Sequence, residues 1–74
     1  MFYVYEVTIN LTSAHLCGQY EDFQLAKSAC RSLSIGQEKN NEEVPYFERE
    51  HNIFIITTTK FGEGETIPKD KAIY

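Results

Sequence analysis

The sequence predicts an α+β domain: a single small two-layer unit with one helix packed on a mainly antiparallel sheet of three to five strands. Two segments, residues 2–11 and 44–60, are rich in aromatic and β-branched residues, which favour strands. Between them, residues 22–34 carry apolar side chains at helical spacing. A helix on one face of a sheet is the simplest two-layer arrangement, so we interpret residues 1–74 as one domain.

The first strand segment, FYVYEVTINL, alternates in polarity. Its odd-numbered positions are uniformly apolar, whereas the even-numbered positions become polar after Val4. We therefore expect the odd-numbered side chains to face the helix and the core: Tyr3, Tyr5, Val7, Ile9 and Leu11. Phe2 and Val4 would then point away from the helix. The N-terminal strand is expected to lie centrally, beside residues 44–60.

Residues 12–20 allow two interpretations, a loop or a turn followed by a short strand over residues 15–20. Gly18 within this segment indicates a bulge or a bend.

The helix is predicted over residues 22–34, with Asp22 as its N-cap and Gly36 as the stop just beyond its end. The following polar residues, 37–43, are expected to form a loop. The side chains expected to face the sheet are Phe23, Ala26, Cys30 and Leu33.

Residues 44–60 are predicted to form a β-hairpin that turns at His51-Asn52, since both residues tolerate positive φ. Alternation then places Phe47, Phe54 and Ile56 on the helix side. The opposite side mixes apolar and acidic residues: Tyr46, Glu48, Glu50, Ile53 and Ile55. Beyond the hairpin, residues 62–65 break the pattern, and residues 62–74 have the composition of a partly mobile tail. Within that tail, residues 72–74 would add a short last strand or pack against the sheet.

The composition restricts the classes of function. A formal net charge of −4 and the absence of a Lys/Arg cluster argue against chain-wide attraction to nucleic acid. No apolar run approaches the ~20 residues of a membrane span, and the first residues do not resemble a signal peptide. Two cysteines without a secretory signal suggest reduced thiols and a cytoplasmic protein.

No residue group carries a catalytic, cofactor or metal signature. Two cysteines and two histidines are present, but Cys17, Cys30, His15 and His51 lack the close pairs that zinc sites offer. Cys17 beside His15 suggests a thiol nucleophile, yet neither an orienting group nor an oxyanion hole is specified. We therefore expect a protein that is not an enzyme and holds no cofactor or metal.

The second face of the predicted sheet is the candidate site. Its apolar residues would form one patch that the helix does not cover, and such patches mark interfaces. The predicted partner-binding residues are Tyr46, Glu48, Glu50, Ile53 and Ile55, with the tyrosine as anchor and the carboxylates as steering charges. The alternative is that residues 12–20 or 67–74 fold over this face.

The order of these elements resembles a known group of proteins. FYVYEVTINLTS, followed by a helix with FQLAKSACRSL and a hairpin, is similar to small phage-encoded α+β proteins of the anti-CRISPR type. The resemblance covers about two thirds of the chain and lies in size, element order and acidity. It implies a stoichiometric inhibitor that blocks a host nucleoprotein complex in the host cytoplasm.

The sequence thus favours a small protein-binding module whose partner offers a basic, nucleic-acid-binding surface. Two alternatives belong to other classes. One is a small nucleic-acid-binding regulator that uses Lys27, Arg31 and Lys39 together with exposed tyrosines. The other is a homodimeric structural protein that buries the open sheet face against a second copy.

Overall fold

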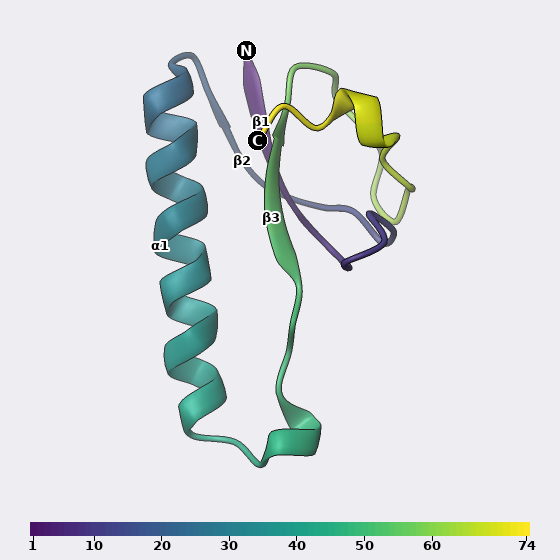
Figure 1. Ribbon diagram of the computed structural model, residues 1–74. Helices are drawn as coiled ribbons and strands as arrows, with labels where there is room; N and C mark the ends of the chain where they lie inside the picture. Colours follow the sequence, from purple (N-terminus) through teal and green to yellow (C-terminus); the bar gives the residue numbers. More distant parts are fainter.

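Three strands and one long helix form the regular structure of residues 1–74 in the computed structural model (Figure 1). Their order along the chain is β1 (Phe2–Val7), β2 (His15–Tyr20), α1 (Phe23–Glu42) and β3 (Ile53–Thr57). Two short 3₁₀ turns, η1 (Tyr46–Glu48) and η2 (Lys69–Lys71), complete it. The helix packs on an open antiparallel sheet, and the predicted α+β class is confirmed.

The sheet has the order β2-β1-β3, and β1 lies at its centre as expected. Both neighbours of β1 are antiparallel to it. Val4 pairs with Gly18 but Tyr5 pairs with Leu16, so Cys17 is an extra residue in β2. This bulge confirms the strand interpretation of residues 15–20 and the bend near Gly18.

Helix α1 begins where the sequence predicted, but the predicted end is wrong. The Asp22 side chain accepts a hydrogen bond of 2.7 Å from the Gln24 N–H. The helix then continues through Gly36 to Glu42, so residues 37–42 are helical rather than a loop. A single glycine costs a helix only about 1 kcal/mol and does not end it. The end comes at Glu43, two residues before Pro45, where the Glu43 N–H still reaches the Asn40 carbonyl.

The predicted hairpin over residues 44–60 is also wrong. Residues 44–52 form no strand: η1 occupies their middle, and β3 starts only at Ile53. There is no turn at His51-Asn52, because the chain runs on from Arg49 into β3, which pairs with β1 instead. The first half of the predicted hairpin is therefore a connector, and its aromatic residues do not enter the sheet.

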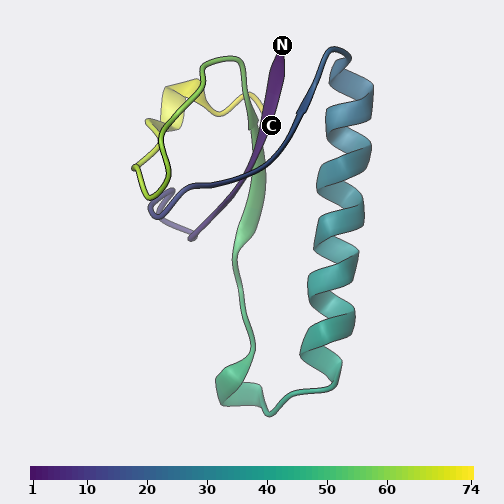
Figure 2. The same cartoon turned by 180° about the vertical axis from the view of Figure 1, so that it is seen from behind.

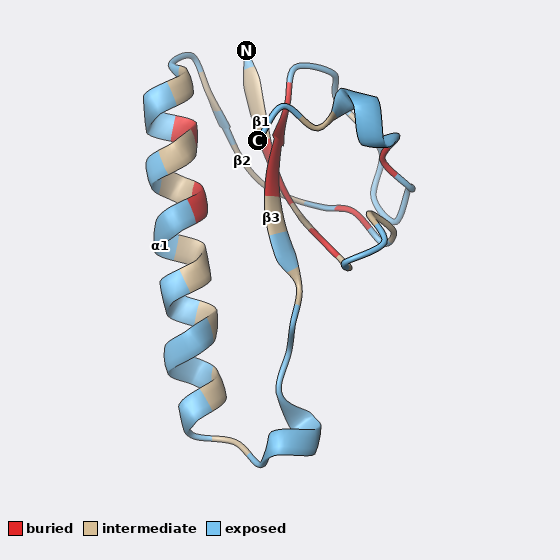
Figure 3. Cartoon of the chain, viewed as in Figure 1, coloured by how far each residue is buried: buried red, intermediate tan, exposed pale blue.

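Both faces of the sheet are covered, and each has its own small core (Figure 3). The helix side buries Val4, Ala26, Cys30 and Ile56. The opposite side buries Tyr5, Val7, Ala14, Ile55 and Ile67. The predicted facing of β1 was thus reversed, since Phe2 and Val4 pack toward the helix while Tyr5 and Val7 face away from it.

The second face is covered by the β1–β2 loop and the C-terminal part of the chain, which lie across the sheet from α1 (Figures 1 and 2). Ile67 is buried there, and its N–H donates to the Leu11 carbonyl over 2.8 Å. Ala14 exchanges backbone hydrogen bonds with Glu65 and Gly64. The interpretation in which the C-terminal segment folds over this face is confirmed, so the sheet offers no open apolar patch.

Candidate functional site

The last six residues of α1 and the connector extend beyond the sheet as an arm, defined as residues 37–52 (Figure 1). The buried residues of the helix, Ala26 and Cys30, both lie in its first half, where the helix packs on the sheet. The arm therefore carries none of the residues that are buried in either core. What holds it together is a set of polar contacts between the helix and the returning chain.

Two side-chain amides of α1 clamp the returning chain. Asn41 donates to the Glu50 carbonyl over 2.7 Å and accepts from the Glu50 N–H over 3.0 Å. One turn earlier, Gln37 donates to the Asn52 carbonyl over 3.0 Å. The four residues from Gln37 to Asn41 rise about 6 Å along the helix, and the two residues from Glu50 to Asn52 span about 6.6 Å of extended chain. The two amides therefore have the same spacing as the backbone groups that they bond. At the base of the arm the Asn52 side chain also donates to Glu6 over 2.9 Å.

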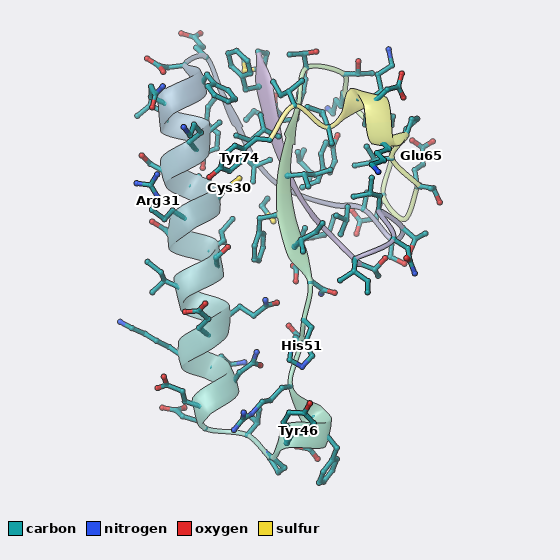
Figure 4. All side chains as sticks on the ribbon, viewed as in Figure 1. Cys30, Arg31, Tyr46, His51, Glu65 and Tyr74 are labelled. Atoms are coloured by element: carbon teal, nitrogen blue, oxygen red, sulfur yellow. The ribbon has the colours of Figure 1, made fainter.

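The tip of the arm presents two adjacent aromatic side chains to solvent. Tyr46 is 78% exposed and Phe47 83% exposed, on the single turn of η1 (Figure 4). Pro45 starts this turn, and its carbonyl accepts a 2.9 Å hydrogen bond from Glu48. Arg49 ends it, with its guanidinium 5.8 Å from the centre of the Tyr46 ring and its Nε donating to the Val44 carbonyl.

The arm also holds most of the net charge of the protein. It contains five glutamates against one lysine and one arginine, hence a formal charge of −3 out of −4 for the chain. Four of these glutamates, at positions 42, 43, 48 and 50, lie on either side of the exposed aromatic pair, and all four are exposed. The tip is therefore an apolar spot within an acidic surface.

The five predicted partner-binding residues do not share a sheet face. Tyr46, Glu48 and Glu50 lie exposed on the arm, and Ile53 lies at its base, 38% exposed. Ile55 is 4% exposed and belongs to the core opposite the helix, so it is not available to a partner.

Phe47, which alternation assigned to the core, is the most exposed large apolar residue of the chain. The signal that would have shown this is Pro45 just before the aromatic pair, because proline disfavours a paired strand.

The thiols and histidines do not form a reactive group. Burial raises the pKa of both the Cys17 and Cys30 thiols, the opposite of what activates a nucleophile. The His15 ring contacts Glu63 rather than a thiol, with Nδ1 2.9 Å from Oε1. The Cys17 thiol donates to the His15 backbone carbonyl, and the side chain packs against the helix-side core. The structure brings no three metal-binding side chains together.

The one pocket lies away from the arm, between the β1–β2 loop and residues 66–72. It has a volume of about 660 Å³ and is lined mainly by apolar groups, including Ile9, Leu11 and Ile67. Lys69 is its only charged lining residue, and none of the predicted site residues contributes to it.

The cations of the nucleic-acid alternative do not form a stripe. The Lys27 ammonium lies 5.7 Å from the Phe23 ring and 5.4 Å from the Tyr74 ring. Arg31 is exposed one turn further along α1, and Lys39 lies among the glutamates of the arm. The sheet face that the homodimer alternative would bury is already covered by other parts of the same chain.

No helix of the structure combines the length and the apolar character needed to cross a membrane. Comparison with protein-family models, with curated proteins and with solved structures finds no match to this chain.

Proposed function

We propose that this chain is a non-enzymatic protein-binding module and that the arm is its binding element. The observation that carries the proposal is the exposure of Tyr46 and Phe47 at 78% and 83% on a backbone that Asn41 clamps to α1. Neither side chain contributes to either core, so the fold does not explain their presence. Aromatic residues are the commonest anchors of protein interfaces.

The ordered backbone of the arm makes the aromatic pair Tyr46 and Phe47 suited to binding. An aromatic side chain buries 150–250 Å² and has only two torsions to order, so it gains much contact area at a small cost in entropy. The backbone of η1 is held by hydrogen bonds from Glu48 to Pro45 and from Arg49 to Tyr46. The chain that follows it is held at Glu50 and Asn52 by the amides of Asn41 and Gln37. A partner would therefore bind a tip whose conformation is already fixed, which reduces the free-energy cost of binding.

The charge of the arm suggests the chemistry of the partner. Acidic side chains around an aromatic anchor complement a basic surface with an apolar hollow, and their field would accelerate encounter. Proteins that bind nucleic acid have such surfaces. A module docked there would exclude the nucleic acid, which is how a small phage-type inhibitor of a nucleoprotein complex would act.

Site-specific photo-cross-linking tests the proposal. A photoreactive phenylalanine analogue replaces Phe47 in one variant and Leu25 in a matched control, since Leu25 is also exposed, at 58%, but lies in the first half of α1. Both variants are expressed in the cells from which the sequence comes and irradiated there. We expect a discrete cross-linked protein with a basic surface from position 47 and none from position 25. Equal cross-linking from both positions, or none from position 47, would contradict the assignment.

A further inference from the structure

We infer that the outer edge of β3 is a binding site for an extended peptide. In the structure, residues 72–74 of this chain occupy part of that site in place of such a peptide. β3 pairs only with β1, so its other edge has no neighbouring strand. This site is separate from the tip of the arm and does not depend on the function proposed for it.

Alternate residues along the extended chain from Glu50 to Ile56 direct their backbone groups to this edge. Side chains of α1 form hydrogen bonds with the first two of these residues: Asn41 bonds Glu50, and Gln37 bonds Asn52. At the far end, the Ile56 carbonyl accepts a 2.9 Å hydrogen bond from the Ile73 N–H.

Phe54, between these positions, is the residue of this edge whose two backbone groups both lack a partner, and the Ile56 N–H is unpaired as well. Since the Ile56 carbonyl points away from β1, alternation directs the N–H and C=O of Phe54 to the same side. Neither group has a partner among the hydrogen bonds of the loops or side chains. A peptide that paired here would satisfy both groups.

The contacts of residues 72–74 define the peptide that fits. Ala72 is extended, with φ −82° and ψ 110°. The ring of Tyr74 stands edge-on to Phe23 at 6.3 Å, and the Lys27 ammonium lies 5.4 Å from it. Figure 4 shows Tyr74 beside the helix. The site therefore selects an extended backbone followed by an aromatic side chain that packs edge-on against Phe23 and beside the Lys27 ammonium.

The internal segment is held loosely enough to be replaced. It makes a single backbone hydrogen bond to β3, and Ile73 and Tyr74 remain 48% and 50% exposed. A partner strand of the same kind would keep the contacts with Ile56, Phe23 and Lys27. It would add the two hydrogen bonds to Phe54 that residues 72–74 do not make. Such strand addition is a common mode of peptide recognition.

The test uses the full chain with Ile73→Pro, which removes the N–H that bonds Ile56 and leaves the edge uncovered. The probe is a peptide with the sequence of residues 69–74, acetylated and amidated at its ends. Its binding is monitored in NMR spectra through the backbone amide signals of Phe54 and Ile56. We expect saturable shifts of both signals in the variant. Wild type should bind at least about tenfold more weakly, because its own segment competes at a high effective concentration.

Two controls complete the test. A probe with proline at the position of Ile73 should cause no shift, since it lacks the donor. Tyr74→Ala provides a second way to release the segment if Ile73→Pro does not fold, and it should bind the probe like the proline variant. The inference is wrong if the probe leaves the Phe54 and Ile56 signals of the released variants unchanged, or if wild type binds it equally well.

Discussion

At the scale of single residues, Tyr5 fastens the C-terminal part of the chain to the sheet. Its side chain is buried, and its hydroxyl donates to the Phe61 carbonyl over 3.0 Å while accepting from the Phe61 N–H over 2.6 Å. The two rings also meet edge-on, 6.1 Å apart. A buried hydroxyl with both bonds satisfied holds a segment 56 residues away in place.

Tyr5→Phe should therefore lower the free energy of unfolding by about 1–3 kcal/mol, because it leaves the Phe61 backbone groups without their partner. Urea denaturation measures the change. Tyr3→Phe is the matched control, since the Tyr3 hydroxyl has no hydrogen bond in the structure, and it should change stability by less than about 0.5 kcal/mol. Equal effects of the two substitutions would show that the Tyr5 hydroxyl does not hold the segment.

The pair of His15 and Glu63 gives a prediction about pH. The hydrogen bond and charge of Glu63 raise the pKa of His15 above 6.5. Because the folded pKa lies above the unfolded one, the contribution of the pair to stability is complete below pH 6.5 and is lost as the pH rises through the raised value. An NMR titration of the His15 ring should show this raised pKa, and Glu63→Gln should lower it. A pKa of His15 that Glu63→Gln leaves unchanged would contradict the contact.

At the scale of elements, α1 and β1 show what the sequence could and could not predict. Strand-forming residues located the start of β1 and its central place, and Asp22 marked the start of α1. The predicted end of the strand at residue 11 is wrong, because β1 ends at Val7 and Ile9 is exposed. Alternation alone could not tell which side of β1 faces the helix, because Phe2 and Val4 are as apolar as Tyr3 and Tyr5. A sheet covered on both faces has no polar face to orient it.

The errors in the candidate site arise from long-range contacts. Residues 37–42 have no apolar stripe, and the helical state there is supported by the amides of Gln37 and Asn41, whose partners lie 15 and 9 residues further along. Tyr46 and Phe47 have high strand propensity, but no strand is available to pair with them. The local pattern therefore placed Tyr46 and Phe47 in a strand, with Phe47 facing the core, whereas both lie exposed on η1.

Gly36→Ala distinguishes the long helix from the predicted loop. Gly36 lies inside α1, its φ is not positive, and an added methyl group would meet no atom within 4 Å. The substitution should raise the free energy of unfolding by about 0.5–1 kcal/mol, measured by urea denaturation. Gly64→Ala is the opposite control, because its φ of +80° strains any other residue. Destabilisation by Gly36→Ala would indicate that the helix ends there.

At the scale of the whole molecule, the fold separates the two cores from the proposed binding element. Both cores and the covered sheet lie at one end, and the arm carries exposed aromatic and acidic side chains at the other. The molecule is accordingly elongated, with extents of 36, 23 and 17 Å. Substitutions at the tip should therefore change binding without changing stability, which allows the two properties to be tested independently.

The central claim is that Tyr46 and Phe47 anchor a partner. The most direct measurement uses the partner that position 47 captures by cross-linking. The affinity of this purified partner is compared between wild type and the variant Tyr46→Ala/Phe47→Ala. Leu25→Ala/Ile35→Ala serves as the control, since it removes two exposed apolar side chains from α1. Unfolding free energies should stay within about 1 kcal/mol of wild type for both. We predict a loss of affinity of at least about thirtyfold for the tip variant and less than about threefold for the control. An unchanged affinity of the folded tip variant, or equal losses in both, would contradict the claim.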